Sequence, residues 1–379
     1  MRKYIFIQNI VTPYRTSLFN DLYSEKFNFS VFYMAKSEKD RNWEFDKESL
    51  EHPYFVDKTG IYFFIKKVGF HFHFNPYLIY KVLKSKASDI ILGGSWNDIN
   101  ILIFCVLKKM RITRKIYHIW SEANIYTLGS QNDSSIKRKL RNFVFKTVDG
   151  NFIVPGRMSE LTFNKWGVKN KRFVLLPNLI NESTFSIDQG SSEKRKKNDL
   201  PIFFMPVRLL ERIKGILNFF NAIGIDNIKK AKFLIAGNGD DSQVYQSFVM
   251  DNNLQENIIL LGFQDYHQIN QLYNQANVFL LPSFSDPSPL SLVEALKMKL
   301  PVLVSLHCGN HYEALKDGYN GYGFNPYNPL EIKGKFEKLM LERDKWELQG
   351  QNSYQMYLNN FDKKKSIESF MKQMNSCYL

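Results

Sequence analysis

Two short segments in the second half of the sequence combine charged side chains in a way that suits a diphosphate. In residues 207–215, Arg208 and Lys214 flank a loop between an expected strand and an expected helix. In residues 281–296, Asp286 lies in a loop rich in Pro and Ser, and Glu294 lies on the helix that follows. A diphosphate carries about two negative charges, which cationic side chains and the free N–H groups of a helix N-terminus can neutralise. The two segments therefore predict a phosphate site with two carboxylates beside it.

The two carboxylates are expected to do different work. Asp286 precedes the helix and Glu294 lies about one turn inside it, so one acid can face a sugar and the other a ribose. An alternative is that Asp286 is a turn residue and that the basic loop is ordinary surface, because Arg and Lys are mostly exposed. Glu294 is harder to explain in this way, because it stands among apolar residues of the helix.

Alternating strands and helices are expected to hold these segments in place. The first half predicts strands at residues 4–8, 29–34, 90–92, 115–119 and 150–154, and helices at 77–85, 97–109, 134–147 and 157–166. The second half predicts strands at residues 201–207, 232–236, 258–261, 278–281 and 302–305, and helices at 215–223, 243–252, 266–275 and 290–298. This alternation is typical of parallel sheets with helices on both faces.

A polar stretch at residues 188–199 separates the two halves and contains no large apolar residue. It is predicted to be a linker, and a chain of 379 residues is long enough for two domains. Open parallel sheets bind ligands at the carboxyl ends of their strands. Two such sheets that face each other would form a cleft between the domains.

The order of short motifs from residue 204 to residue 325 resembles the donor domain of glycosyltransferase family 4. The series is Arg-x5-Lys-Gly, Ala-Gly-Asn-Gly, Leu-Gly-Phe, Pro-Ser with an acid eight residues before Glu-Ala, Leu-Pro-Val, Gly309 with Glu313, and Asp-Gly-Tyr-Asn-Gly. Each motif alone is weak evidence, but the ordered set is specific. The family has the GT-B fold and retains the anomeric configuration, so the resemblance implies an α/β protein in which two Rossmann-like domains face each other across a cleft.

The resemblance implies roles for the residues that match the motifs of the phosphate site. Arg208 and Lys214 would clamp the diphosphate, and Glu294 would accept hydrogen bonds from the ribose hydroxyls. The backbone at Leu290 and Ser291 would meet the phosphates.

The same resemblance assigns the rest of the donor site. Gly237 would belong to it, and the turn of Gly262 and Phe263 would lie beside the base. Asp286 stands where the family usually has Glu facing the donor sugar, so it is a catalytic candidate with a carboxylate that is one methylene shorter. Asn310 is a second departure, at a position where a glycine often follows the first one.

The first half offers further candidates on the opposite side of the cleft. The loop after the first strand ends in Pro-Tyr-Arg instead of a Gly-rich run, which resembles a known variant and puts Tyr14 and Arg15 on the acceptor side. His118 and Glu122 follow a later strand, and in similar enzymes a His or an acid here lies near the anomeric centre or the acceptor. Both are therefore catalytic candidates, and the alternatives are a structural histidine and a surface acid.

The resemblance also implies a division of the chain. An acceptor-binding domain is expected at residues 1–187, the linker at 188–199, a nucleotide-sugar-binding domain at 200–360, and a helix at 361–379 that returns to the first domain. The implied function is transfer of a sugar from a nucleoside diphosphate-sugar to a glycan or lipid-linked acceptor in lipopolysaccharide, O-antigen or capsule synthesis. The donor is a co-substrate and no cofactor is expected. The sequence has no Asp-x-Asp triplet at a strand end, so no metal is expected either.

Two other functions remain open at this point. Sugar-nucleotide 2-epimerases share the two-sheet architecture, but they convert the donor without an acceptor. A non-catalytic subunit that binds nucleotide-sugar is the other alternative, suggested by Asp286 and by the missing Gly-rich loop.

The formal net charge of +14 lies in the first half of the chain. Residues 1–180 carry 29 Lys and Arg against 15 Asp and Glu, whereas residues 181–379 carry 22 of each kind. A one-sided basic surface suggests a polyanionic partner, and residues 61–74 and 134–146 mix basic with apolar side chains as in segments that bind anionic membranes. The alternatives are a solvated Lys-rich surface and an apolar stripe that belongs to the core.

Several classes are disfavoured by the sequence. No nucleic-acid recognition motif accompanies the basic charge. The longest apolar run, residues 99–107, is too short to cross a bilayer, which needs about 20 residues. Three widely spaced cysteines suggest a reducing compartment. A cytoplasmic location is expected, with peripheral attachment to the inner face of the plasma membrane.

Overall fold

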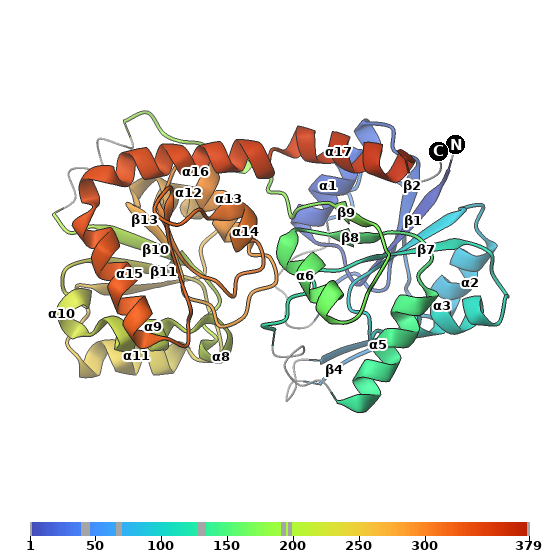
Figure 1. The fold of residues 1–379 in the computed structure, drawn as a ribbon, viewed down its shortest axis with the longest axis horizontal. Coiled ribbons are helices and arrows are strands. Elements are labelled where there is room, and N and C mark those ends of the chain that lie inside the picture. The colour runs from blue at the N-terminus through green and yellow to red at the C-terminus, as the bar shows by residue number, and fades with distance from the viewer. Residues whose placement is uncertain are drawn as a thin grey trace.

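The computed structural model describes residues 2–38, 46–65, 70–127, 134–190, 195 and 199–376. These residues form two α/β lobes that lie side by side, the first at the right of Figure 1 and the second at the left. The first lobe contains a seven-stranded sheet of order β3-β2-β1-β6-β7-β8-β9, and the second a six-stranded sheet of order β12-β11-β10-β13-β14-β15. Neighbouring strands of both sheets pair in parallel. The predicted α/β class with two Rossmann-like domains is confirmed.

The elements of the first lobe agree with the expected alternation and add an antiparallel hairpin, β4–β5. They are β1 (Tyr4–Gln8), α1 (Pro13–Ser24), β2 (Phe29–Tyr33), β3 (Tyr54–Val56), β4 (Ile61–Ile65), β5 (Phe70–Phe74), α2 (Pro76–Lys84), β6 (Asp89–Gly93), α3 (Ile99–Lys109), β7 (Ile116–Trp120), α5 (Ser135–Thr147), β8 (Phe152–Val154), α6 (Arg157–Lys165) and β9 (Phe173–Leu175).

The second lobe follows the predicted series closely. It consists of β10 (Ile202–Pro206), α8 (Glu211–Lys214), α9 (Ile216–Ile223), α10 (Ile225–Ile228), β11 (Lys232–Ala236), α11 (Ser242–Asp251), β12 (Ile258–Gly262), α12 (Tyr266–Gln275), β13 (Val278–Leu281), α13 (Leu290–Lys297), β14 (Val302–Ser305), α14 (His311–Ala314), β15 (Gly321–Phe324), α15 (Pro329–Leu341) and α16 (Trp346–Asn360). Most of the expected linker, residues 191–194 and 196–198, lies outside the described residues.

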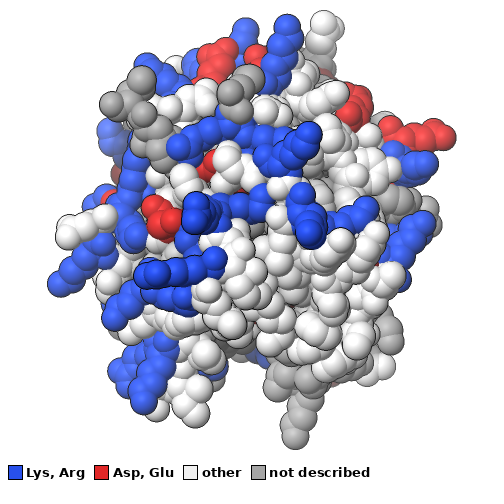
Figure 2. All heavy atoms as spheres, turned by 90° about the vertical axis from the view of Figure 1, so that its right-hand side faces the viewer, with Lys and Arg blue, Asp and Glu red and all other residues white. Residues whose placement is uncertain are grey.

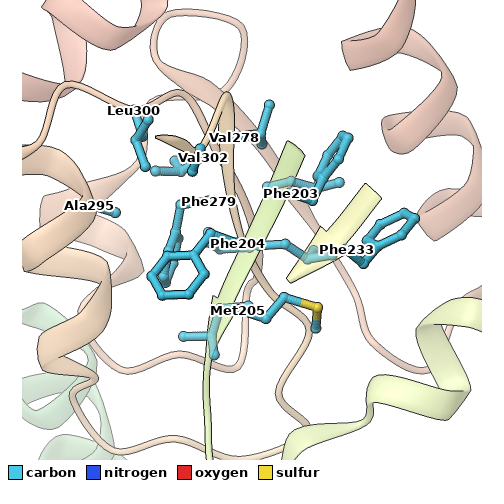
Figure 3. Close-up of a cluster of buried hydrophobic side chains, with 14 of the residues drawn as sticks. Phe203, Phe204, Met205, Phe233, Val278, Phe279, Ala295, Leu300 and Val302 are labelled. Atoms are coloured by element: carbon cyan, nitrogen blue, oxygen red, sulfur yellow. The ribbon is translucent and has the colours of Figure 1, made fainter. Parts of the chain in front are cut away.

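Apolar strands fill the core of the second lobe. Phe203, Phe204 and Met205 are consecutive on β10 and all fully buried, because helices cover both faces of this parallel sheet. Figure 3 shows them among side chains of the neighbouring strands and of α13. The rings of Phe203 and Phe233 stack at 5.2 Å between centroids. This rigid layer fixes where the loops after β10, β11 and β13 emerge.

The chain crosses back to the first lobe at its C-terminal side. Helix α16 packs on α13 of the second lobe, and α17 (Lys363–Asn375) continues over the first lobe, as the red helices along the top of Figure 1 show. Ile367, Phe370 and Met374 of α17 are buried in the same apolar cluster as side chains of β1, α1 and β2. The first lobe therefore takes part of its core from the far end of the sequence.

Candidate active site

A cavity of about 850 Å³ opens between the two lobes. The first lobe lines it with residues that follow β1, β6 and β7, and the second lobe with Tyr266 and the segment from Asp286 to Leu290. The strands β1 and β6 are adjacent in the first sheet, as are β10 and β13 in the second, and in each sheet the strand order reverses there. Ligands of open α/β sheets bind outside the carboxyl ends of strands at such switch points. The cavity therefore lies where the topology of both sheets predicts a ligand site.

Lys214 and Asp286 form an ion pair at the edge of this cavity. Lys214 Nζ lies 2.5 Å from Asp286 Oδ2, and both side chains are largely buried. Gly215 makes the approach of the two loops possible, because it has φ of +59° and a Cβ there would lie 2.9 Å from the carbonyl oxygen of Pro282. The backbone N–H of Ser285 donates to the carbonyl of Ile213 at 3.2 Å, which ties the loops together. The two expected phosphate-site segments are thus brought into contact.

The ion pair shows which group the carboxylate of the unusual Asp286 contacts. In this structure its carboxylate faces the lysine of the phosphate site, and its main-chain carbonyl accepts a hydrogen bond of 3.1 Å from Asn124 of the first lobe. Arg208 lies on the loop after β10 with an exposed side chain. The second lobe thus offers two cations in the segment that follows β10, one exposed and one held by an acid.

Glu294 lies on α13, one turn from the helix N-terminus formed by Leu290 and Ser291. The Tyr273 hydroxyl donates to its Oε2 at 2.9 Å, and also lies 3.0 Å from the carbonyl of Ser291. Burial raises the pKa of Glu294 to about 7, although the hydrogen bond from Tyr273 acts in the opposite direction. A carboxyl group in this state can lose its proton near neutral pH and accept hydrogen bonds from a diol. Pro289 occupies the N-cap position of α13 and makes no side-chain cap.

Nucleotide binding should strengthen as the pH rises through 7. In the role expected for it, the ionised form of Glu294 accepts hydrogen bonds from a ribose diol, so below its pKa of about 7 each pH unit should weaken nucleoside diphosphate binding up to tenfold. The effect of pH on folding has the opposite sign. In the unfolded chain the Glu294 carboxyl has its ordinary pKa of 4.5, whereas in the folded protein it keeps its proton up to about pH 7. The free energy of unfolding without ligand should therefore fall as the pH rises from 4.5 to 7. Isothermal titration calorimetry across this range measures the first effect.

Glu294→Gln should bind weakly at every pH, because the amide cannot ionise. Glu368→Gln is the matched control, since that exposed carboxylate lies on α17. A wild-type affinity that stays constant from pH 5.5 to pH 8 would contradict the role given to Glu294.

Two glycines that were expected in the donor site, Gly237 and Gly262, join neighbouring loops. The N–H of Gly237 donates to the carbonyl of Gly262 at 2.7 Å, which joins the loops after β11 and β12. Gly237 has φ of +143°, and a Cβ there would lie 2.0 Å from the carbonyl oxygen of Val207, so only glycine fits. The Phe263 ring that follows is 66% exposed, which leaves a flat apolar face for a ring to stack on.

On the first-lobe side, Arg15 and Glu122 form a second ion pair within the cavity. Arg15 Nη2 lies 2.7 Å from Glu122 Oε1, and the guanidinium lies 3.7 Å from the centre of the Trp120 ring. Asn178 Nδ2 donates to the same Glu122 oxygen at 3.0 Å. Tyr14 also lines the cavity, and its ring is 5.1 Å from the guanidinium. The residues expected on the acceptor side therefore gather around the ion pair of Arg15 with the partly exposed Glu122.

The expectation that His118 takes part in catalysis is wrong for this structure. His118 is fully buried inside β7, where its Nε2 lies 3.1 Å from Asp89 Oδ1 and its Nδ1 accepts the N–H of Asn151 at 2.9 Å. Burial raises the pKa of Asp89, but hydrogen bonds from His118 and Ser88 outweigh it and bring that pKa below its usual range. Strand β7 runs on to Trp120, which leaves His118 in the sheet and only Glu122 beyond its end.

Several residues that join the lobes were not predicted from the sequence. Asn124 Nδ2 donates to the carbonyl of His307 at 2.9 Å, and the rings of Tyr126 and His307 stack at 3.7 Å. Glu313, named above only as part of a motif, accepts the N–H of Arg157 at 2.6 Å, the first residue of α6 in the first lobe. A carboxylate at a helix N-terminus is favourable, so this contact stabilises the present arrangement of the lobes. Single Asn and Tyr residues in loops carry no motif that could have identified them.

Across the described residues, no group of three or more His, Cys, Asp and Glu side chains is arranged to hold a metal ion. Within the same part of the chain, no helix has the length and apolar character needed to cross a bilayer.

Comparisons with known proteins agree with this architecture. Residues 187–356 match the family model described as "Glycosyl transferases group 1". The chain is 24% identical over 303 residues to an uncharacterized glycosyltransferase of Methanocaldococcus jannaschii, an alignment that covers 75% of this chain and 74% of that protein. It is 28% identical over 263 residues to the UDP-Gal:alpha-D-GlcNAc-diphosphoundecaprenol alpha-1,3-galactosyltransferase of Escherichia coli, covering 64% of each chain.

The fold is also similar to solved structures. The crystal structure of Anabaena Alr3699/HepE in complex with UDP superposes with a TM-score of 0.76 at 15% identity, covering 99% of this chain and 100% of that one. This similarity shows the GT-B fold that the sequence predicted. The sequence matches support a glycosyltransferase, and the family model covers the lobe that contains Lys214, Asp286 and Glu294.

Proposed function

We propose that the chain is a glycosyltransferase that moves a sugar from a nucleoside diphosphate-sugar to an acceptor held on the first lobe. The observation that carries the proposal is the Lys214–Asp286 ion pair at the edge of an interlobe cavity that Asp286 and Leu290, the first residue of α13, line, with Glu294 one turn further along that helix. A diphosphate needs cations and N–H donors, and a ribose needs a carboxylate. We assign the donor to this side, with Arg208 as the second cation and with Gly237, Gly262 and Phe263 around the base.

The same arrangement supports a metal-independent mechanism in which configuration is retained. Glycosyl transfer passes through an oxocarbenium-like state while negative charge grows on the leaving diphosphate. Lys214, Arg208 and the N–H groups at the start of α13 stabilise that charge in the partly buried cleft. Donor binding requires Lys214 to exchange the Asp286 carboxylate for phosphate oxygens, which releases Asp286 to face the sugar. Attack from the same face, with the diphosphate taking the acceptor proton, needs no strong base from the protein.

We further propose that the acceptor is a glycan or lipid-linked glycan of cell-surface polysaccharide synthesis, such as lipopolysaccharide, O-antigen or capsule, and that the enzyme works at the inner face of the plasma membrane. The support is the similarity to the E. coli transferase whose name specifies a diphosphoundecaprenol acceptor.

Thermal-shift measurements with UDP, GDP, CDP and dTDP identify the nucleotide, because a bound ligand stabilises the fold. Transfer from the matching nucleotide-sugars to lipid-linked acceptors then tests the reaction. Donor turnover that does not depend on an added acceptor would favour the epimerase instead.

The basic end of the first lobe supports attachment to an anionic membrane. Figure 2 shows Lys and Arg side chains over much of this end of the molecule. Near the end of α3, exposed apolar and basic side chains alternate, namely Val106, Lys109, Met110, Arg111, Ile112 and Arg114. On α5 the predicted apolar stripe is divided: Val144 is in the core, whereas Ile136 and Leu140 are 70% and 40% exposed. Exposed apolar groups among basic ones are typical of surfaces that bind the headgroup region.

The protein should float with phosphatidylglycerol-containing vesicles at low salt and be released at high salt. Each basic residue near the surface contributes about 1 kcal/mol, so Lys109→Gln combined with Arg114→Gln should weaken binding roughly thirtyfold. Lys333→Gln combined with Lys338→Gln, on α15 of the second lobe, is the matched control. Equal flotation of the two double variants would rule out this surface, and no flotation of the wild type would rule out the membrane.

A further inference from the structure

Tyr273 of α12 meets the first turns of α13 through a single hydroxyl group. Its oxygen lies 2.9 Å from Glu294 Oε2 and 3.0 Å from the carbonyl oxygen of Ser291. Side chains of a helix lean toward its N-terminus, so the Glu294 carboxylate lies over the turn that contains Ser291, three residues earlier. The hydroxyl can therefore reach both acceptors, although a phenol has only one hydrogen to donate.

The ring of Tyr273 is held among other rings in the core of the second lobe. Tyr273 is fully buried, and its ring packs edge-on against Phe204 at 4.9 Å and Phe185 at 5.8 Å between centroids. Burial and the neighbouring Glu294 raise the pKa of the Tyr273 hydroxyl well above its usual value, so it keeps its proton near neutral pH. The oxygen is thus fixed in place, whereas its hydrogen can turn from one acceptor to the other.

The two acceptors suit the two protonation states of Glu294. Hydrogen bonds to ionised groups are roughly twice as strong as neutral ones, so the hydroxyl of Tyr273 turns to Glu294 when that carboxylate is ionised. A protonated Glu294 can instead donate to the Tyr273 oxygen, and the hydroxyl then turns to the Ser291 carbonyl. Because Oε2 stays bonded to Tyr273 in both states, Oε1 is the carboxylate oxygen that a ribose would use.

Tyr273 is the ionisable residue that acts most directly on Glu294. Tyr266 of α12 is a second phenol near it, since the charge of Glu294 adds to burial in raising the pKa of Tyr266. On α13 itself, the Lys297 ammonium donates to the Glu182 carbonyl at 2.7 Å. Strands β13 and β14, which pack against α13, have no ionisable side chain. The other elements that pack against it, α14 and α16, contribute His311, Tyr312, Glu313, Glu347, Tyr354 and Tyr357. Burial and the Tyr273 hydrogen bond are the causes that shift the pKa of Glu294.

We propose that Tyr273 is a positioning residue of the nucleotide site, whose hydroxyl holds Glu294 Oε2 in both protonation states and thereby sets the pH below which a nucleoside diphosphate is released. The inference rests on the proposed function, because it deepens the ribose contact assigned to Glu294. Loss of the hydroxyl takes more from the ionised carboxylate than from the neutral carboxyl, so Glu294 then needs a higher pH to ionise.

Tyr273→Phe tests this role in the absence of ligand through the pH dependence of folding. The pKa of Glu294 is higher in the folded protein than in the unfolded chain, so its contribution to stability is lost as the pH rises through the folded value of about 7. Without the hydroxyl, this loss should extend about one pH unit higher. Urea denaturation at a series of pH values measures it, and Phe fills the space of the ring, so the variant should fold.

The same variant should shift nucleotide binding by the same amount. The midpoint of the pH dependence of the UDP Kd should rise by about one unit, so the Kd should be up to tenfold higher than that of the wild type at pH 6.5 and within twofold of it at pH 9. Isothermal titration calorimetry measures both, with GDP, CDP or dTDP in place of UDP if one of them is the nucleotide that binds. Titration of the ligand's phosphates is common to both proteins and cancels in the ratio.

Tyr322→Phe is the matched control, because Tyr322 is another buried phenol of the second lobe and donates to Glu342 Oε2 at 2.5 Å. That hydrogen bond lowers the pKa of Glu342 from 4.5, so both profiles should match those of the wild type above about pH 5. In a Glu294→Gln background, Tyr273→Phe should shift neither profile, since the amide does not ionise.

A measurement on the wild type covers the case in which Tyr273→Phe does not fold. With tyrosine labelled with carbon-13 at Cζ, one resonance should titrate near pH 7, stop doing so in Glu294→Gln and persist in Tyr266→Phe. Absence of such a resonance would contradict the coupling between Tyr273 and Glu294.

The remaining outcomes separate the inference from the proposed function. If the wild type binds a nucleoside diphosphate and Tyr273→Phe leaves the binding midpoint where it was, the role of Tyr273 is overturned and donor binding stands, whether or not the folding profile moves. If the wild type binds none of the four nucleoside diphosphates, the proposed function fails, and the inference with it.

Discussion

Lys214→Ala is expected to reduce kcat by about 10²–10³ with the nucleotide-sugar that the protein uses. The charge on the leaving diphosphate grows in the transition state, and a fixed cation in a partly buried site stabilises it more than water can. Lys214 is placed for this role, since its Nζ already holds an anionic oxygen at 2.5 Å, that of Asp286. The loss should appear in kcat more than in the donor KM, because the interaction strengthens as the bond breaks.

Two further variants make this result specific. Lys214→Arg keeps a cation and should recover part of the rate, whereas Lys333→Ala, on an exposed face of α15, should leave kcat unchanged. Initial rates at saturating donor are the measurement, and thermal denaturation confirms that each variant is folded. Turnover by Lys214→Ala within threefold of the wild type would remove Lys214 from the mechanism and leave the donor site without its best-placed cation.

His118→Ala is expected to lower the free energy of unfolding by about 3 kcal/mol while kcat at low temperature stays within twofold. The substitution removes one partner of a fully buried pair, since both His118 and Asp89 are 0% exposed, and it also removes the acceptor for the N–H of Asn151. Breaking such a pair leaves a buried carboxylate with fewer partners, which is among the costlier single changes in a protein core.

Urea denaturation of wild type and variant measures the destabilisation, and rates are compared well below the melting temperature. His267→Ala is the control, because that histidine is exposed on α12 and its loss should change stability by less than about 0.5 kcal/mol. A variant that unfolds like the wild type but has lost most of its activity would return His118 to the list of catalytic candidates.

The sequence predicted the second lobe better than the first, for a physical reason. In the second lobe β11, β13 and β14 are largely apolar runs and occur at the predicted positions, whereas β15 (GYGF) was not predicted. The candidate ligand loops follow β10 and β13 directly, which is why a linear series of motifs could indicate that Lys214 and Asp286 lie close together. Residues such as Gly215 and Gly237 lie at a single sheet edge, and local spacing is enough to find them.

The first lobe depends more on contacts between distant segments. His118 lies within both the predicted strand 115–119 and β7, so its burial depends on what packs against the sheet and not on where the strand ends. The stack of Tyr126 on His307 and the cap that Glu313 places on α6 depend on how the lobes meet. The spacing of apolar residues around Tyr126 and around Glu313 does not indicate how the two lobes meet.

The return of α17 to the first lobe sets an order for biosynthesis. Ile367, Phe370 and Met374 are at most 3% exposed in a cluster with Phe27 and other residues of the opening βαβ unit. A ribosome delivers the opening unit first and these three only after the entire second lobe has been made. The apolar surface of the N-terminal sheet that these three residues cover therefore stays exposed until residue 374 has been translated. We expect the nascent chain to need chaperone protection during that interval.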